Sequence, residues 1–279
     1  MICTAHFPED REKVINLWSS CFGDERNYIE FFLDNVPSED VLFVYKEKDE
    51  IVGMTWLMPA EIGFYMYGDY RNRKLYYVYA VGVDKEYRNR GIAGKLLSFA
   101  KAHAENKEAG LCLVPADEGL VSYYSKRGFS KITASNREYD SELNAAENIS
   151  ASFMNSDVIK LEELKNKDLD SFRNYSKELY LQREKELCCK MAFRWSYDNF
   201  YFALCEHIYV GGTVRVKKET EGLEYMFALQ EQGAFKIREI LADNGIDGDI
   251  DFDMMVNVDN IYTYESKISK GIYVNFCFN

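Results

Sequence analysis

The sequence predicts an α/β protein: a mixed central sheet flanked by helices in the first half, followed by a second domain of helices and strands. Three observations predict this class. Residues 75–83 (LYYVYAVGV) are apolar or aromatic on both faces, as the residues of a central strand are. A basic, glycine-containing turn then leads straight into an amphipathic helical pattern over 92–106. Residues 140–156 are small and polar with little periodicity, which indicates a linker.

The elements before the central strand are two helices and a hairpin. Apolar residues at helical spacing run through 9–34 and are interrupted at Gly23, so two helices are expected there. The runs 41–46 and 51–58 are rich in β-branched and aromatic residues and flank a polar turn, which predicts a hairpin.

The elements after the central strand begin with the helix over 92–106. Its buried side is expected to consist of Ile92, Leu96, Phe99, Ala100 and His103. A short buried strand, a short helix and a final strand pair should follow at 111–114, 117–127 and 129–138.

These patterns divide the chain into a first domain over 1–142, a linker over 143–156 and a second domain over 157–279. The second domain is expected to open with a strand and with helices over roughly 161–195. Strand candidates then follow at 207–216, 223–230, 234–241, 249–258 and 271–279.

Composition and charge exclude several classes of function. The net charge of −12 argues against nucleic acid as a partner, because phosphate binding needs a basic face. The chain has no run of about 18 apolar residues that would predict a membrane span. Its start lacks the basic region and apolar run of a secretory signal, so a cytoplasmic protein is expected. The acidic balance favours a cationic small molecule or peptide as partner.

Metal sites are not expected either. The seven cysteines contain no C-x-x-C pair, and the three histidines are scattered along the chain at His6, His103 and His207. The acidic run Asp247, Asp249, Asp251 and Asp253 fails the calcium-loop test, because Phe252 and Val258 stand where a glycine and a glutamate are required. Its alternation with apolar residues indicates an exposed strand face instead.

The segment 87–94 (YRNRGIAG) joins the central strand to the helix. The first turn of a helix has unpaired N–H groups and the positive end of the dipole, and small residues there let a phosphate approach. Arg88 and Arg90 can add charge-assisted contacts. The junction therefore predicts a pyrophosphate-binding turn. The alternative is that Gly91 only allows a tight turn and that the arginines are solvated. The segment is neither a Walker A motif nor a dinucleotide fingerprint.

Arg88-x-x-Gly91-x-Ala93 resembles the signature Q/R-x-x-G-x-G/A of the Gcn5-related N-acetyltransferase (GNAT) superfamily. The flanking residues are also similar, and residues 123–129 (YYSKRGF) resemble the family's Y-x-x-x-G-F segment. The likeness covers about residues 1–140. It implies the GNAT fold and the transfer of an acetyl group from acetyl-CoA to a primary amine, by direct attack through a tetrahedral intermediate.

The resemblance implies a cofactor site on the central strand and the turn after it. The backbone of Val81 and Val83 would bind the pantetheine arm, and a bulge near Gly82 would open the sheet. The same bulge would offer an N–H to the oxyanion. The pyrophosphate would be held by the turn, which consists of Arg88, Asn89, Arg90, Gly91, Ile92, Ala93 and Gly94.

The resemblance also implies catalytic residues. Tyr124 matches the family tyrosine and is expected to protonate the leaving thiolate, because a phenol with a pKa of about 10 stays protonated at neutral pH. The alternative is a core tyrosine, and Tyr123 is a neighbouring competitor for the role. Many relatives have an asparagine at the position of Asp117, which is expected to cap a helix. Asp117 or Glu118 could also bind a cationic acceptor.

The second half contains no second R-x-x-G-x-G/A, so a single CoA site is expected. Its order of elements resembles tandem-GNAT proteins of the Eis-like type, in which a degenerate second GNAT domain completes the acceptor cleft. In that plan the carboxylate of Asn279 is a candidate general base, and the alternative is an ordinary edge strand over 271–279. Two other functions stay open: an acyl-CoA-binding sensor without catalysis, and an aminoacyl transferase, against which the acidic charge and the CoA signature argue.

Overall fold

A computed structural model describes residues 1–66, 69–134, 153, 158–188, 192–219, 222–231, 234–242, 245–247 and 252–257 of the chain. The chain forms two compact units. The first unit contains residues 1–61, 73–132 and 253–268, and the second contains 62–72, 133–252 and 269–279. The predicted linker and the strand at 271–279 therefore fall outside the described residues, except for Phe153.

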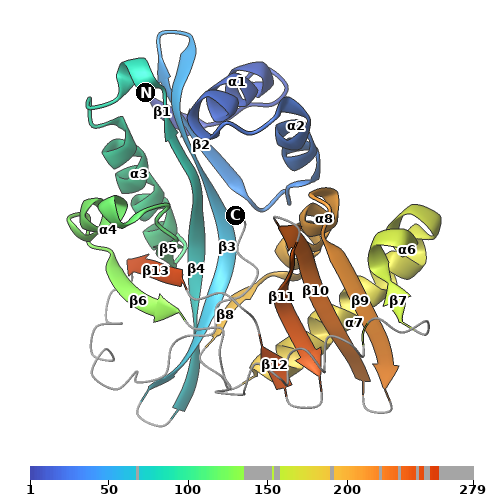
Figure 1. Cartoon of the computed structure of the whole chain (residues 1–279). Coiled ribbons are helices and arrows are strands. Elements are labelled where there is room, and N and C mark those ends of the chain that lie inside the picture. Colours follow the sequence, from blue (N-terminus) through green and yellow to red (C-terminus); the bar gives the residue numbers. More distant parts are fainter. Residues whose placement is uncertain are drawn as a thin grey trace. The chain divides into compact units, whose positions relative to one another are not determined.

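A mixed sheet forms the centre of the first unit (Figure 1). Its β4 and β5 strands are parallel, whereas the pairs β1–β2, β2–β3 and β5–β13 are antiparallel. The order of the strands across the sheet is β1 (Ile2–Thr4), β2 (Val41–Glu47), β3 (Glu50–Met66), β4 (Asp69–Val83), β5 (Gly110–Leu113), β13 (Phe252–Asn257) and β6 (Ser130–Ala134). The predicted hairpin and central strand are thus confirmed, and β1 is an addition to the prediction.

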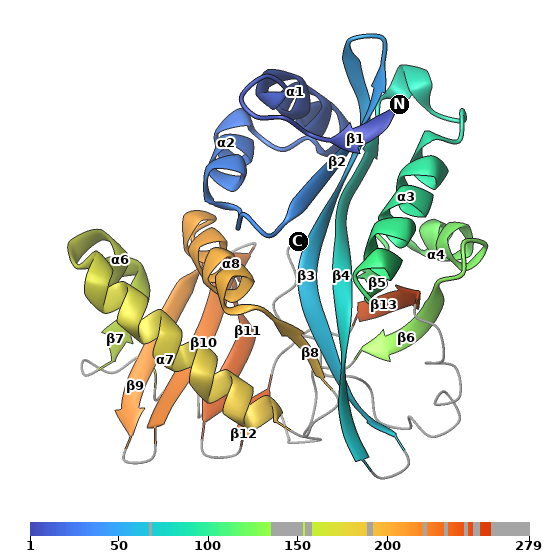
Figure 2. The same ribbon diagram turned by 180° about the vertical axis from the view of Figure 1, so that it is seen from behind.

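Helices cover both faces of this sheet (Figures 1 and 2). One face carries α1 (Arg11–Phe22) and α2 (Arg26–Asn35), and the other carries α3 (Ile92–Asn106) and α4 (Glu118–Ser125). The two helices predicted in 9–34 are confirmed. Gly23 ends α1 in the left-handed conformation with a φ of 80°, which a residue without Cβ adopts without strain.

The residues of α3 that are buried differ from those predicted. The buried residues of α3 are Ile92, Leu96, Leu97, Ala100 and Ala104. Phe99 is 41% exposed and only leans edge-on against Phe43, with 4.9 Å between ring centroids. The helix sits very close to β3, because a Cβ on Gly53 would lie 2.8 Å from Cγ2 of Ile92. Leu97 and Ala104 thus belong to the buried side, whereas His103 is only half-buried, with its ring edge-on to Phe43 and Tyr76.

The strand β13 departs from the expected arrangement. Residues 249–258 are predicted to form a strand of the second domain. Instead, β13 lies between β5 and β6 of the first sheet, with Met255, Val256 and Asn257 paired to the residues Leu113, Cys112 and Leu111. Met255 is fully buried in the same core as α3. The first sheet is therefore completed by residues from the far end of the chain.

The second unit has its own five-stranded antiparallel sheet, and α7 lies across one face of it (Figure 2). The strand order is β12 (Gly245–Asp247), β11 (Ala234–Ala242), β10 (Gly222–Glu231), β9 (Thr213–Glu219) and β7 (Ile159–Lys160). The remaining elements are α6 (Leu161–Lys167), α7 (Leu169–Leu187), β8 (Ala192–Trp195), which pairs with β3, and α8 (Tyr197–Tyr209).

The helix α8 corrects the strand predicted at 207–216, which begins only at Thr213. Seven of its residues are buried, so its sequence has no clear polar face from which a helix could be predicted. Ser196 caps its start by accepting a hydrogen bond from Asn199 N at 3.2 Å.

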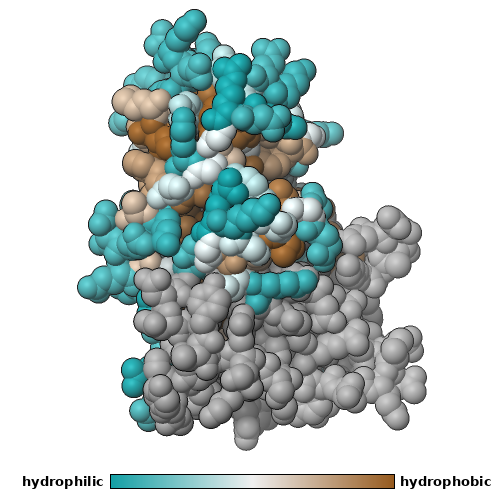
Figure 3. Space-filling model, turned by 90° about the vertical axis from the view of Figure 1, so that its left-hand side faces the viewer, coloured by the Kyte–Doolittle hydropathy of each residue, from teal (hydrophilic) through white to brown (hydrophobic). Residues whose placement is uncertain are grey.

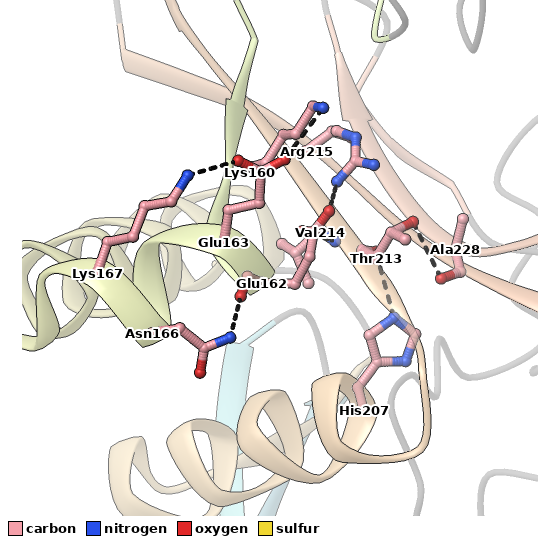
Figure 4. A network of polar contacts seen from close by, with 10 residues as sticks. All are labelled: Lys160, Glu162, Glu163, Asn166, Lys167, His207, Thr213, Val214, Arg215 and Ala228. Carbon is pink, nitrogen blue, oxygen red and sulfur yellow. Dashed lines mark hydrogen bonds and ion pairs between the residues drawn. The ribbon is translucent and has the colours of Figure 1, made fainter.

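A polar network fixes α6 to β9 in the second unit (Figure 4). The Glu162 carboxylate accepts hydrogen bonds from Val214 N, at 3.1 Å, and from the Arg215 guanidinium. Glu163, on the same helix, pairs with Lys160 and Lys167 at 3.2 and 3.0 Å. The Glu162 contacts join segments about 50 residues apart and are charge-assisted, so they contribute to the docking of the helix.

None of the helices formed by the described residues is long and apolar enough to cross a membrane. These residues also contain no group of three or more His, Cys, Asp or Glu side chains that could hold a metal ion.

Candidate active site

The end of β4 separates from its neighbour β5. The two strands pair over Leu75–Tyr77 and Gly110–Cys112, and β5 ends at Leu113. β4 then continues for six more residues to Val83, so its backbone has no β5 partner over Val81–Val83. A separated strand of this kind exposes N–H and C=O groups that an extended ligand can bind in the manner of another strand.

The backbone irregularity on β4 lies at Ala80 and not at Gly82. Ala80 has a φ of 51°, which is uncommon for a residue with a Cβ and indicates local strain. Gly82 has another role: a Cβ there would lie 3.2 Å from Cys21 Sγ and from Phe22 of α1. The glycine therefore lets the end of α1 approach β4 closely, and Ala80 is the residue at which the strand is distorted.

The turn between β4 and α3 contains two residues in the left-handed conformation. Asn89 has a φ of 64° and Gly91 a φ of 75°. Turns of this type direct backbone N–H groups towards a common point and bind anions. The first intrahelical hydrogen bond runs from Lys95 N to Gly91 O at 3.0 Å, so the three preceding amides are not used by the helix. The predicted turn therefore has the backbone that a phosphate requires.

The two arginines of the turn point to structural partners. Arg88 Nε donates to Val83 O at 3.1 Å. Arg90 Nη2 donates to Glu86 O at 3.0 Å, and its guanidinium lies 3.8 Å from Glu47 and over the Tyr87 ring. Arg88 thus fixes the end of β4, and Arg90 is held by its own turn. The backbone of the turn remains the main candidate for phosphate binding.

Tyr124 lies in the core beside the separated strand. It is 7% exposed and packs edge-on against Tyr123 and Phe129. The same core contains Ile92 at the start of α3, and Val81 and Val83 pack against it. Among the described residues, the Tyr124 hydroxyl has no hydrogen-bond partner. Tyr124 and the first residue of α3 thus belong to one hydrophobic core.

The acidic residues at the start of α4 are a cap and an exposed side chain. Asp117 accepts a hydrogen bond from Leu120 N at 3.0 Å and so caps the helix as expected. The side chain of Glu118 is 83% exposed and lies 4.0 Å from Lys131. Figure 3 views the molecule from the side that lies on the left in Figure 1, and hydrophobic and hydrophilic residues are intermingled on this face. The candidate base Asn279 lies outside the described residues.

Burial raises the pKa of Tyr124 to about 12, and Tyr123 and Asp117 add to the rise while Arg127 opposes it. The ordinary pKa of a tyrosine is about 10. The phenol therefore stays neutral and keeps its proton over the whole range in which the protein works.

The raised pKa of Tyr124 predicts a dependence on pH. Because its folded pKa exceeds the unfolded value, stability from the neutral phenol is present below pH ~10 and is lost as pH rises towards 12. Spectrophotometric titration of tyrosinate should show one group ionising near pH 12 that is missing in Tyr124→Phe. A tyrosine titrating near 10 that disappears in this variant would contradict the burial.

Gly91→Ala should weaken CoA binding. A Cβ at Gly91 meets no atom within 4 Å, but its φ of 75° makes any side chain strained, and the methyl group would enter the anion-binding turn. The matched control is Gly211→Ala, a second-unit glycine with a φ of 91° and equally free space. Both variants should lose about 1 kcal/mol of stability, and only Gly91→Ala should lose about tenfold in CoA affinity by calorimetry. Equal affinities in the two variants would show that the turn does not contact the ligand.

The separated strand, the anion-binding turn and the buried tyrosine together point to one domain family. Residues 6–132 match the acetyltransferase (GNAT) domain. The match contains the strand, the turn and the tyrosine of the site, and it covers less than half of the chain. The GNAT domain therefore accounts for most of the first unit. Its match ends in β6, before β13, which comes from the far end of the chain. No curated protein sequence matches the chain at a significant level.

Two solved structures resemble most of the chain. A GCN5-related N-acetyltransferase from Kribbella flavida is 13% identical, with a TM-score of 0.55 over 87% of this chain and 57% of that one. A conserved protein of unknown function from Enterococcus faecalis, described as a probable N-acyltransferase, is 12% identical, with a TM-score of 0.54 over 86% and 57%. The chain thus spans little more than half the length of these proteins. At such identities the likeness supports the fold alone.

Two residues near the site are not among the site residues predicted from the sequence. Arg127 lies against Gly94, and Asn257 Nδ2 donates to Arg127 O at 3.1 Å. Arg127 could have been noticed as the cation inside YYSKRGF. Asn257 carries no signal in the sequence, because its importance depends on the insertion of β13.

Proposed function

We propose that the protein is an acyl-CoA-dependent N-acetyltransferase that transfers an acetyl group from acetyl-CoA to a primary amine. The observation that carries the proposal is the end of β4: the strand leaves β5 after Tyr77, and the turn that follows has Asn89 and Gly91 in the left-handed conformation. The match of residues 6–132 to the GNAT acetyltransferase domain supports the same reading.

The residues of the site fit acetyl-CoA. The backbone of Val81–Val83, which lies beyond the β4–β5 pairing, can bind the amides of the pantetheine arm, except for Val83 O, which accepts from Arg88 Nε. The amides from Asn89 to Gly94 can bind the pyrophosphate. When bound, acetyl-CoA supplies the acetyl group and a thiolate leaving group. In the reaction the amine nitrogen forms a bond to the acyl carbon, the carbon–sulfur bond breaks, and the amine proton passes to a base.

Tyr124 can serve the leaving sulfur as a proton donor. Its pKa of about 12 exceeds the ~8.5 of a cysteine thiol by about 3.5 units, or about 5 kcal/mol for a complete transfer to a free thiolate. Complete transfer is therefore unfavourable even to the departed thiolate. We infer that Tyr124 acts mainly by donating a hydrogen bond to the sulfur as charge develops on it and the carbon–sulfur bond breaks.

The acceptor is proposed to be a small-molecule or peptide amine, and the net charge of −12 favours a cationic one. The second unit is proposed to be a degenerate GNAT-like domain that contributes to the acceptor site. Its antiparallel sheet and the helices α6, α7 and α8 of its described part are compatible with this, and the similarity to the two solved structures extends over it.

The test is turnover of acetyl-CoA, followed by release of thiol, across a panel of polyamines, aminoglycosides, peptide N-termini and lysine side chains. Turnover of at least one amine, with CoA affinity measured in parallel by calorimetry, is the expected result. Binding of CoA without turnover of any amine would favour the alternative function of an acyl-CoA sensor. Absence of CoA binding would refute both.

A further inference from the structure

Arg127 is a cation beside the start of α3. It is not one of the two arginines of the predicted phosphate-binding turn, Arg88 and Arg90. Its Nε and Nη2 lie 3.4 Å from the position that a Cβ on Gly94 would occupy. Gly94 is the third residue of α3, so this guanidinium sits beside the first turn of the helix. Arg127 follows the end of α4 and comes more than thirty residues after Gly94 in the chain.

The guanidinium is held in one orientation. Nη1 donates to Tyr123 O at 2.8 Å, and the guanidinium carbon stacks 3.5 Å from the centroid of the Tyr123 ring. The backbone carbonyl of Arg127 accepts from Asn257 of β13, which is only 8% exposed. Both ends of the residue are thereby fixed before any ligand arrives.

The edge that faces Gly94 is the one suited to an anion. Nε and Nη2 form the side-on pair of parallel donors with which arginine binds carboxylates and phosphates. Within the described part of the chain, these two donors have no hydrogen-bond partner and the guanidinium has no carboxylate at ion-pair distance.

The location is electrostatically unfavourable for a cation alone. The start of α3 carries the positive end of the helix dipole, and the turn before it presents more N–H groups. A guanidinium held at this point is stabilised by an anion that contacts both the guanidinium and the N–H groups at the start of α3. Arg88 and Arg90, by contrast, are held by Val83, Glu86 and Glu47.

We propose that Arg127 is a phosphate-binding residue of the acyl-CoA site and contacts the pyrophosphate together with the α3 amides. This inference rests on the proposed function, because it takes CoA as the ligand. The proton donor Tyr124 on α4 and the cation Arg127 in the turn after α4 would then come from one short segment of the chain.

The experiment compares Arg127→Gln with Lys126→Gln in the full chain by calorimetry with CoA and with dephospho-CoA. Lys126 is the exposed neighbouring residue, so its variant removes the same charge one position away. Arg127→Gln should weaken binding of both ligands by about 10- to 100-fold, because charge-assisted hydrogen bonds are lost. Lys126→Gln should stay within about twofold of the wild type. Thermal unfolding checks that both variants are folded.

Three results would overturn the assignment of Arg127 while leaving the proposed function intact: wild-type affinity in Arg127→Gln, equal losses in the two variants, or a loss seen with CoA but not with dephospho-CoA. The last result would move the contact to the 3′-phosphate. If the wild-type protein itself binds neither ligand, the proposed function fails and the assignment with it. Arg127→Lys should give an intermediate loss, since it keeps the charge and removes the pair of donors.

Discussion

Tyr124→Phe should lower kcat by about 100-fold and leave the affinity for acetyl-CoA within about twofold of the wild type. The size follows from the contribution of a positioned proton donor, which is typically 10²- to 10⁴-fold. The lower end applies because the pKa of about 12 makes this phenol a weak acid. Affinity should be kept, because the phenylalanine ring preserves the packing against Tyr123 and Phe129.

Tyr123→Phe is the matched control for this substitution. Tyr123 lies one position away, and the phenylalanine ring keeps the stacking with Arg127. Its kcat should stay within about twofold of the wild type. A loss in Tyr123→Phe as large as that in Tyr124→Phe would contradict the assignment. So would an unchanged kcat in Tyr124→Phe measured with a saturating amine.

Met255→Asp should unfold the first unit and abolish CoA binding. Met255 is 0% exposed and lies in the core of α3 and Tyr124, so the change removes a buried apolar side chain and introduces a carboxylate without a partner. Each effect alone costs about 2–5 kcal/mol, which approaches the total stability of ~5–15 kcal/mol of a domain. Circular dichroism and calorimetry with CoA measure the two consequences.

Leu181→Ala is the control for the loss of a large side chain, because Leu181 is 57% exposed and its variant should change stability by less than about 0.5 kcal/mol. A fragment of residues 1–142 tests the same feature in another way. It lacks β13, so it should neither unfold cooperatively nor bind CoA. A fragment that bound CoA as the whole chain does would show that β13 is dispensable.

The local features of the first unit could be read from the sequence. The central strand, the turn at Gly91 and the helix after it follow from hydrophobic runs and from one glycine, and all depend on residues close together in the chain. The cap at Asp117 was predicted for the same reason. Within these elements the prediction that Phe99 is buried was wrong, because the packing of α3 also depends on its close approach to Gly53 of a distant strand.

The features that could not be predicted are those that depend on residues distant in the sequence. The sequence of β13 shows a strand but not its neighbours, because pairing partners are not encoded in the local alternation of side chains. The place of Arg127 against Gly94 depends on the packing of α4 on α3. The strained conformation of Ala80 could not be predicted either, because alanine at this position looks like any other strand residue. The roles of Asn279 and of the linker over 143–156 stay predictions.

The position of β13 also determines when the first sheet can be completed during synthesis of the chain. The bond from Asn257 to Arg127 joins residues 130 positions apart, and almost all the second unit is translated between them. Until β13 leaves the ribosome, β5 and β6 of the nascent chain lack the strand between them. The first sheet is therefore completed only after most of the second unit has been translated, and until then its open strand edges are prone to aggregation.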